Sequence, residues 1–251
     1  MKRVGRIALV VFCLLGLFSL IAQQVFSSPS TIPPGLEDRP PLEKQIFIHY
    51  KKGYGKPPGP GREEKAPSCY GFLAKGAYWK VLPIDYVIDL DYSGLNQKEV
   101  TSAIEKAAQE WDGYTRPTLF GGWQIVHGAT WDSDEPDGYN EFLFGNYSDP
   151  NVIAITVTWG YFSVPPAFRR IIEFDVLFDT DFVWGDAKIN PEVMDLQNIA
   201  THEIGHGLGL ADVYQTACSP VTMYGYSIEG ETQKQTLAAP DIKGLQALYG
   251  L

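Results

Sequence analysis

The sequence has few of the residues that build closed structural metal sites or that bind polyanions. Its 251 residues include three cysteines and four histidines, and 20 lysines and arginines stand against 30 aspartates and glutamates. Structural zinc sites usually need four protein ligands and more cysteine than this. A formal net charge of −10 argues against nucleic acid and anionic membrane as partners.

Long apolar runs are confined to the N-terminus. Lys2, Arg3 and Arg6 precede the apolar segment 7–22, and no charged residue follows until Glu37. This pattern is typical of a secretory signal and is short for a membrane span. We predict a signal peptide over residues 1–27, with an uncleaved membrane anchor as the alternative. In either case the remaining chain is secreted or lies at the cell surface.

Cysteine usage agrees with export. Cys13 lies in the predicted signal, which leaves Cys69 and Cys218. An even pair of cysteines can form one disulfide in an oxidising compartment. Two unrelated thiols are the alternative.

Residues 28–66 are rich in proline and glycine. We interpret them as a linker or a short pro-segment, with one short strand at Gln45–Tyr50. His49 falls here, and we expect it to be a surface histidine.

The rest of the chain, residues 67–251, has the apolar patterning of one globular domain. Alternation and β-branched residues predict strands at 81–90, 123–126, 141–144, 152–159 and 171–178, with 141–144 as a short edge strand. Helical periodicity predicts helices at 97–112, 193–208 and 240–249. His127 ends a predicted strand and is expected to be structural. The acidic segment 132–141 is interpreted as a solvated loop, with a structural Ca²⁺ site as the alternative.

The most informative motif is His202-Glu203-Ile204-Gly205-His206 on the second predicted helix. Residues four apart on a helix lie on one face, so His202 and His206 can reach one ion. Zinc binds neutral imidazole, and a catalytic zinc site keeps one position open for water. Glu203 lies about 100° round the helix from His202, which suits a general base beside that open position.

Two residues after the motif extend the prediction. Gly209 stands where a helix would end in the left-handed conformation that glycine adopts readily. Asp212 follows in a loop and is the predicted third zinc ligand, because His49 and His127 are distant in sequence. Its alternative role is a polar loop residue at the helix end.

The C-terminal half resembles the metzincin clan of zinc metallopeptidases, and within it the matrixin family. Ile172-Glu173-Phe174-Asp175-Val176 is similar to the strand before the active-site helix, and Met223-Tyr224 to the methionine turn. Asp241–Gly250 is similar to the last helix. The resemblance implies an α+β domain with a twisted mixed sheet of about five strands, an active-site helix and a C-terminal helix. It also implies that Met223 lies beneath the metal and that Tyr224 lines a substrate pocket.

Three features depart from the matrixin pattern. Asp212 replaces the third histidine, a substitution similar to that in snapalysin-type peptidases, and Gly225 replaces the usual proline after the methionine turn. Pro67-Ser68-Cys69 only weakly resembles the cysteine-containing inhibitory segment of animal matrixins, so we favour a Cys69–Cys218 disulfide.

The residues and the resemblance together predict a monomeric zinc-dependent endopeptidase acting on proteins or peptides. A non-catalytic zinc-binding module for adhesion or assembly on the same fold is the competing prediction. The intact Glu203 argues against that module, since loss of this carboxylate is the simplest way to disable the site.

Overall fold

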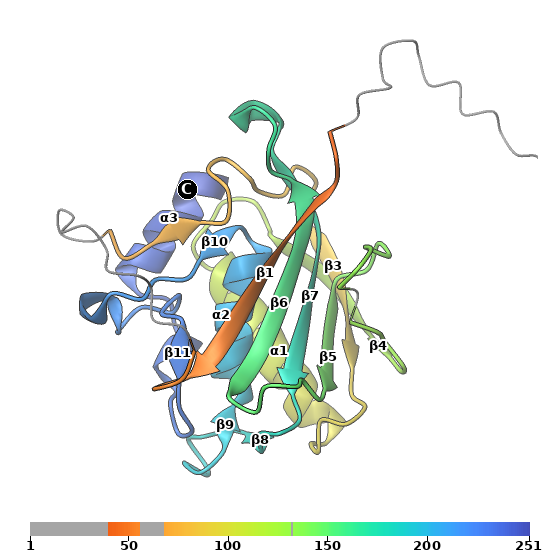
Figure 1. Ribbon diagram of the computed structural model, residues 1–251, viewed down its shortest axis with the longest axis vertical. Helices are drawn as coiled ribbons and strands as arrows, with labels where there is room; N and C mark the ends of the chain where they lie inside the picture. Colours follow the sequence, from red (N-terminus) through yellow and green to blue (C-terminus); the bar gives the residue numbers. More distant parts are fainter. Residues whose placement is uncertain (1–39, 56–67, 132) are drawn as a thin grey trace, which may run out of the picture. The chain divides into compact units, whose positions relative to one another are not determined.

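A seven-stranded mixed sheet, in the order β11-β1-β6-β7-β5-β3-β4, forms the framework of the chain in the computed structural model (Figure 1). The structure describes residues 40–55, 68–131 and 133–251, and the predicted signal segment 1–27 lies outside them. The sheet strands are β1 (Glu43–Lys51), β3 (Ile84–Asp89), β4 (Phe120–Val126), β5 (Glu141–Gly145), β6 (Val152–Tyr161), β7 (Arg170–Asp179) and β11 (Tyr226–Ser227). Two small pairs, β2 (Gly71–Phe72) with β10 (Leu210–Ala211) and β8 (Trp184–Gly185) with β9 (Met194–Asp195), complete the described strands.

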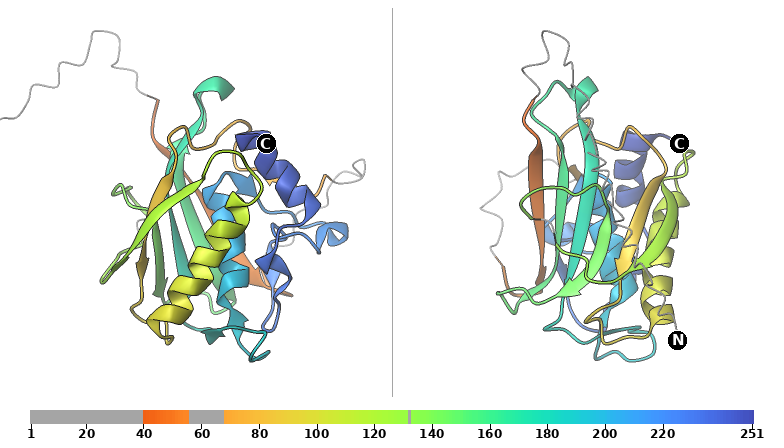
Figure 2. Two further views of the ribbon diagram at one scale, coloured as in Figure 1. Left: turned by 180° about the vertical axis from the view of Figure 1, so that it is seen from behind. Right: turned by 90° about the vertical axis from the view of Figure 1, so that its right-hand side faces the viewer.

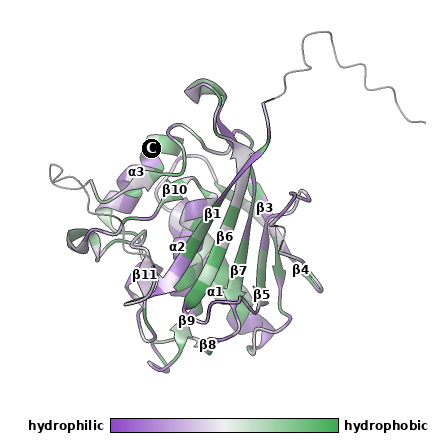
Figure 3. Cartoon of the chain, in the orientation of Figure 1, coloured by the Kyte–Doolittle hydropathy of each residue, from purple (hydrophilic) through white to green (hydrophobic). Residues whose placement is uncertain are grey.

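The sheet is mixed because β3, β4, β5 and β7 run parallel, whereas β6 runs antiparallel to β7. Strands β6 and β7 are buried along nearly their whole length and form the apolar centre of the sheet (Figure 3). The prediction that 141–144 is an edge strand is wrong, because β5 lies between β3 and β7. Because the segment is short, the sequence did not indicate that it lies in the centre of the sheet, where even Glu141 is buried.

β1 lies toward the edge of the sheet opposite to β4. It pairs antiparallel with β6 from Glu43 to Tyr50. The short strand predicted at Gln45–Tyr50 is therefore present and longer than expected. It belongs to the segment interpreted as a linker, so the sheet includes residues from outside the predicted domain 67–251.

The part of the chain that the structure describes has three α-helices beside the sheet, α1 (Gln97–Asp112), α2 (Leu196–Gly207) and α3 (Ala239–Tyr249). Helix α1 packs along α2 (Figure 2). Trp111 of α1 is fully buried and donates from Nε1 to the carbonyl of Thr201 in α2, at 2.8 Å. The predicted α+β fold with an active-site helix and a closing helix is confirmed. Among the described residues, every helix is too short or too polar to cross a membrane.

Helix α2 begins three residues later than predicted, because Asp195 is its N-cap. The Asp195 carboxylate accepts hydrogen bonds from the backbone N–H of Asn198 and Ala187, at 2.7 and 2.9 Å. Gln235 Nε2 donates to the same carboxylate at 2.8 Å. At the other end, Gly209 has the predicted left-handed conformation, with φ of 101°. Both ends of the helix are thus fixed by local chemistry.

Cys69 and Cys218 form a disulfide across a sequence separation of 149 residues, with a Cα–Cα distance of 5.2 Å. Cys218 is buried with Val213 and Val221 in a small apolar cluster. The bond ties the segment before β2 to the loop that follows the motif.

Loss of the Asp195 cap should destabilise the chain more than loss of an exposed cap. Asp195→Ala leaves buried donors without an acceptor, so we expect the free energy of unfolding to fall by about 2 kcal/mol or more. Asn96→Ala, at the exposed N-cap of α1, is the matched control and should cost about 1 kcal/mol. Urea denaturation of both variants measures the difference, and an equal or smaller loss for Asp195→Ala would contradict the assignment.

Candidate active site

Two histidines on α2 present their Nε2 atoms to the same point. The Nδ1 atoms of His202 and His206 lie 2.7 and 3.0 Å from the backbone carbonyls of Thr222 and Leu210. A carbonyl only accepts, so each Nδ1 carries the proton and each Nε2 keeps a lone pair in the neutral ring. The two Nε2 atoms are 3.1 Å apart and both rings are buried. Two facing lone pairs are stable together only around a cation or a shared proton.

Asp212 completes a group of three ligand atoms. The chain turns at Gly209, and Oδ1 of Asp212 comes to lie 3.1 Å from Nε2 of His202 and 3.5 Å from Nε2 of His206. Ligand atoms bound tetrahedrally to zinc at 2.0–2.1 Å are separated by roughly 3.4 Å. This Oδ1 is buried and has no hydrogen-bond partner among the described residues. The donor set and its spacing therefore fit a zinc ion.

The ionisation of the third group suits a metal ligand. Burial on its own would raise the pKa of Asp212, but the adjacent His206 and His202 rings hold that pKa well below its usual range. Tyr214 O–H donates to the other oxygen of Asp212, Oδ2, at 3.0 Å. This hydrogen bond leaves Oδ1 directed at the histidines.

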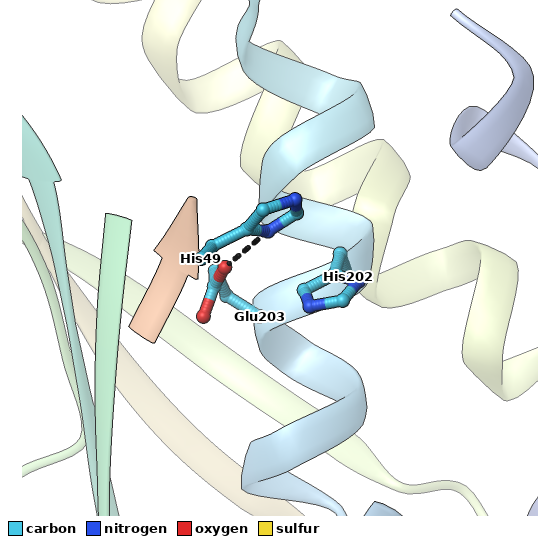
Figure 4. A group of neighbouring side chains, drawn as sticks. All are labelled: His49, His202 and Glu203. Carbon is cyan, nitrogen blue, oxygen red and sulfur yellow. Dashed lines mark hydrogen bonds and ion pairs between the residues drawn. The ribbon is translucent and has the colours of Figure 1, made fainter. Parts of the chain in front are cut away.

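Glu203 lies beside this group, and both of its carboxylate oxygens are engaged. Oε1 is 2.9 Å from Nδ1 of His49 (Figure 4). Oε2 accepts a hydrogen bond from the Thr156 hydroxyl. Burial alone would raise the pKa of Glu203, but the His49 hydrogen bond and the adjacent His202 lower it. The side chain is therefore held as a carboxylate.

His49 is the main correction to the sequence analysis. It was expected at the surface, but it is 1 % exposed and lies against the ring of His202, with ring centroids 4.0 Å apart. Burial and the nearby His202 lower the pKa of His49 to about 3, so the ring is neutral. It comes from β1, 154 residues before its partner Glu203. No local pattern in the sequence could have indicated this contact, because it depends on the pairing of β1 with β6.

A buried lysine extends the same network and was also missed. Lys234 is fully buried and donates to the Ser227 hydroxyl, and Ser227 Oγ lies 3.1 Å from Nε2 of His49. Lys234 also donates to the Tyr226 carbonyl at 2.7 Å and to Glu231 at 2.8 Å. The hydrogen bonds run from Lys234 through Ser227 and His49 to Glu203.

The segment that we predict to be the methionine turn packs against α2. Met223 is fully buried, and its Sδ lies so close to Gly205 of α2 that a Cβ there would collide with it. Asp241 holds this turn by accepting from the backbone N–H of Thr222 and Met223, at 2.9 and 3.1 Å. Thr222 in turn supplies the carbonyl that orients His202. Tyr224 is half-buried and lies against Tyr226, with ring centroids 5.7 Å apart.

The two further sequence candidates lie away from this site. His127 is exposed and pairs with Asp91, at 3.0 Å. Residues 133–141 belong to the described chain, whereas Asp132 does not. A calcium ion in that acidic segment stays a prediction.

Asp241 should affect the affinity for zinc although it does not contact either histidine ring. Asp241→Asn keeps the size but turns donors toward the Thr222 and Met223 N–H groups, so we expect zinc affinity to fall about 10- to 100-fold. Titration against a chromogenic chelator measures this. Asp134→Asn, the same change at an exposed carboxylate, is the control. Unchanged affinity in Asp241→Asn would contradict a positioning role.

Comparison with known proteins agrees with the fold and the site. A family model described as Matrixin matches residues 78–250. Interstitial collagenase of Oryctolagus cuniculus is 29 % identical over 172 residues, and stromelysin-1 of Mus musculus is 31 % identical over 175 residues; each alignment covers 68 % of this chain and 33 % of the relative. Metalloendoproteinase 1 of Glycine max is 40 % identical over 79 residues, 30 % of this chain and 25 % of that protein. The chain spans about one third of the length of the first two relatives. Because the family model covers well over half of the sequence, including His202, Glu203, His206 and Asp212, the chain belongs to the matrixin family.

Proposed function

We propose that the chain is an exported zinc-dependent endopeptidase with Glu203 as its general base. The observation that carries this proposal is the convergence of three buried ligand atoms, 3.1–3.5 Å apart, beside a buried carboxylate on a matrixin fold. The Cys69–Cys218 disulfide and the basic and apolar N-terminus support export.

Bound zinc would lower the pKa of a coordinated water and polarise the scissile carbonyl. His202, His206 and Asp212 would hold the ion. Glu203 would accept the proton of the attacking water and then deliver it to the leaving amine nitrogen. Thr156, hydrogen-bonded to Oε2, keeps the carboxylate in place during both transfers.

Asp212 as third ligand agrees with its neighbour Tyr214 and with Gly225, another departure from the matrixin pattern. The Tyr214 hydroxyl holds Oδ2 of Asp212, and the Tyr214 ring packs against the Cα of Gly225, where any side chain would collide with it. A Cβ at residue 225 would also come within 3.0 Å of Asp212 Oδ1. Gly225 therefore makes room for an aspartate ligand and its tyrosine partner, which explains why proline is absent here.

The substrate would bind as an extended strand along the edge of the sheet next to α2. Backbone hydrogen bonds to the edge of the sheet would give affinity without regard to sequence, and side-chain pockets would give selectivity. Tyr224 and Tyr226 line one cavity, together with Ile228 and Gln233. We assign this cavity to a substrate side chain after the cut bond.

Replacing the proposed base should separate zinc binding from turnover. Glu203→Gln keeps the shape of the side chain but cannot accept the proton, so we expect hydrolysis of denatured protein to fall at least about 100-fold. Zinc content, measured by atomic emission, should stay at one ion per chain. Both proteins should lose activity when a chelator is added. A zinc-loaded chain that cleaves nothing would contradict the endopeptidase proposal and favour the non-catalytic module.

Replacing the proposed third ligand should weaken zinc binding itself, unlike the replacement of Glu203. Asp212→Ala removes one of three protein ligands, so zinc affinity should fall at least about 100-fold, whereas Tyr214→Phe should cost about 10- to 100-fold by freeing the carboxylate. Isothermal titration with zinc measures both. If Asp212→Ala binds zinc as tightly as the unmodified chain, Asp212 is a loop residue and not a ligand.

A further inference from the structure

We propose that the loop between β6 and β7 docks the chain on an anionic phospholipid surface. An apolar tip, residues 164–168, would enter the headgroup layer, and the cations around it would contact lipid phosphates. We call these cations the basic surface; they are Lys75, Lys80, Arg169 and Arg170. This inference goes beyond the proposed function, because it depends neither on zinc nor on peptide hydrolysis.

The tip is a run of apolar residues in contact with water. Its sequence is Val164-Pro165-Pro166-Ala167-Phe168, and every residue except Val164 is exposed. The Phe168 side chain is 67 % exposed. Figures 1 and 2 show that the segment between β6 and β7 projects beyond the end of the sheet. A run of exposed apolar residues is unfavourable on a surface that meets only water, so it indicates a contact with another apolar phase.

The backbone of the tip suits transfer out of water. Pro165 and Pro166 have no N–H group. The N–H of Phe168 donates to the carbonyl of Pro165 at 2.8 Å, within the 3-10 helix Pro166–Phe168. Two of the four exposed residues therefore have no backbone donor, and a third has its donor satisfied inside the tip. Unpaired N–H groups are what makes an irregular loop costly in an apolar medium, so this tip can enter one at low cost.

Positive charge gathers beside the tip although the whole chain carries −10. Residues 68–84 contain two lysines and no acid, and residues 152–172 contain two arginines and no acid. Arg169 Nη1 donates to the carbonyl of Lys75 at 2.7 Å, which joins the two segments. Charges more than about 8 Å away are largely screened at physiological salt. The total charge, from which an anionic membrane looked unfavourable as a partner, therefore does not describe this surface.

Two of the cations lie on tyrosine rings. The guanidinium of Arg170 is 4.2 Å from the ring centroid of Tyr161, and Nζ of Lys80 is 3.4 Å from that of Tyr78. The N–H of Ile171 donates to the carbonyl of Tyr78 at 3.2 Å, so both pairs belong to one surface. Both cations remain exposed. Tyrosine combines an apolar ring with a polar hydroxyl and is enriched at membrane–water interfaces.

The described chain also begins at this surface. Glu43, the first residue of β1, pairs in register with Gly160 and accepts hydrogen bonds from the N–H and hydroxyl of Ser163, at 2.7 and 2.6 Å. Glu43 offsets one of the four positive charges. The apolar segment 7–22, predicted to be a signal or an anchor, precedes β1 in the sequence. A retained anchor would raise the local concentration of lipid at the tip, because residues 23–39 are a short linker.

The apolar tip favours lipid over an acidic polysaccharide as the partner. A sulfated polysaccharide would pair with the cations but would gain nothing from burying Phe168. A phospholipid surface offers phosphates to the cations and an apolar layer to the tip, which is the pairing that interfacial protein segments use.

A fluorophore on the tip reports lipid contact directly. The full chain with Cys13→Ser and Ala167→Cys takes an environment-sensitive dye at one position, because Cys69 and Cys218 are bonded to each other. On phosphatidylcholine vesicles with about one third phosphatidylglycerol, its emission should rise several-fold and shift to the blue, and phosphatidylcholine alone should give a smaller response. Ile189→Cys is the control, 84 % exposed in the segment between β8 and β9 at the opposite end of the sheet (Figure 1), and should not respond. An unchanged emission at residue 167 would overturn the proposal.

Charge reversal in the labelled chain tests the basic surface. Lys75→Glu/Arg170→Glu should lower the ratio of docked to free tips at least about 20-fold, since each cation near an anionic surface contributes about fivefold. Lys98→Glu/Lys106→Glu makes the same change on the exposed face of α1 and should alter the ratio about twofold or less. Equal losses in the two variants would show a response to total charge and would overturn the assignment to this surface.

Removal of the aromatic ring separates lipid from polysaccharide. Phe168→Ala should lower docking on the anionic vesicles at least about tenfold, because burial of this ring in the headgroup layer is lost. Tyr92→Ala, at an exposed aromatic residue after β3, is the control and should have no effect. Heparin that binds Phe168→Ala as tightly as the unmodified chain, with no response to the vesicles, would make this a polysaccharide site and overturn the proposal. None of these measurements uses hydrolysis, so a failure of the endopeptidase proposal would leave their outcome unchanged.

Discussion

The site depends on two hydrogen bonds from imidazole Nδ1 atoms to backbone carbonyls. Those of Thr222 and Leu210 fix the tautomer of His202 and His206, so both Nε2 lone pairs point to one place. A helix alone would only bring the two side chains to the same face. Both carbonyls belong to segments that follow the helix. These segments must therefore be held in place as firmly as the helix itself. Gly209 supplies the turn that brings Leu210 back, and Asp241 holds the turn that presents Thr222.

Asp212, the proposed third ligand, is coupled to Tyr214 and to Gly225, another departure from the matrixin pattern. An aspartate is shorter than a histidine and carries a second oxygen, which needs its own partner when it is buried. Tyr214 supplies that partner, and Gly225 leaves space for its ring. Two neutral rings and one carboxylate would also give a bound metal an anionic ligand, which should reduce the positive charge felt by a coordinated water. A single replacement of Asp212 therefore disturbs a set of residues adapted to each other.

Sequence reasoning succeeded where the information is local. The capped helix over 97–112, the left-handed Gly209 and the spacing of His202, Glu203 and His206 are short-range patterns, and the structure contains each of them. It failed where a contact spans the sheet. Residues 141–144 look like an edge strand because they are few and begin with a charge, but β5 is central. His49 looked like a surface residue because it lies within residues 28–66, a segment rich in proline and glycine. Only strand pairing across the chain shows that it faces Glu203.

The chemistry of His49 also explains why β1 is more than a cover for the edge of β6. An apolar residue would protect that edge at lower cost, because burying polar groups is unfavourable unless each one is paired. Here a neutral histidine is buried and paired at both nitrogens, with Glu203 on one side and Ser227 on the other. Glu203 would otherwise be a buried carboxylate needing water or another donor in the same position. His49 thus supplies the hydrogen bond that the buried Glu203 carboxylate needs, so β1 contributes a polar contact to the motif as well as covering the edge of β6.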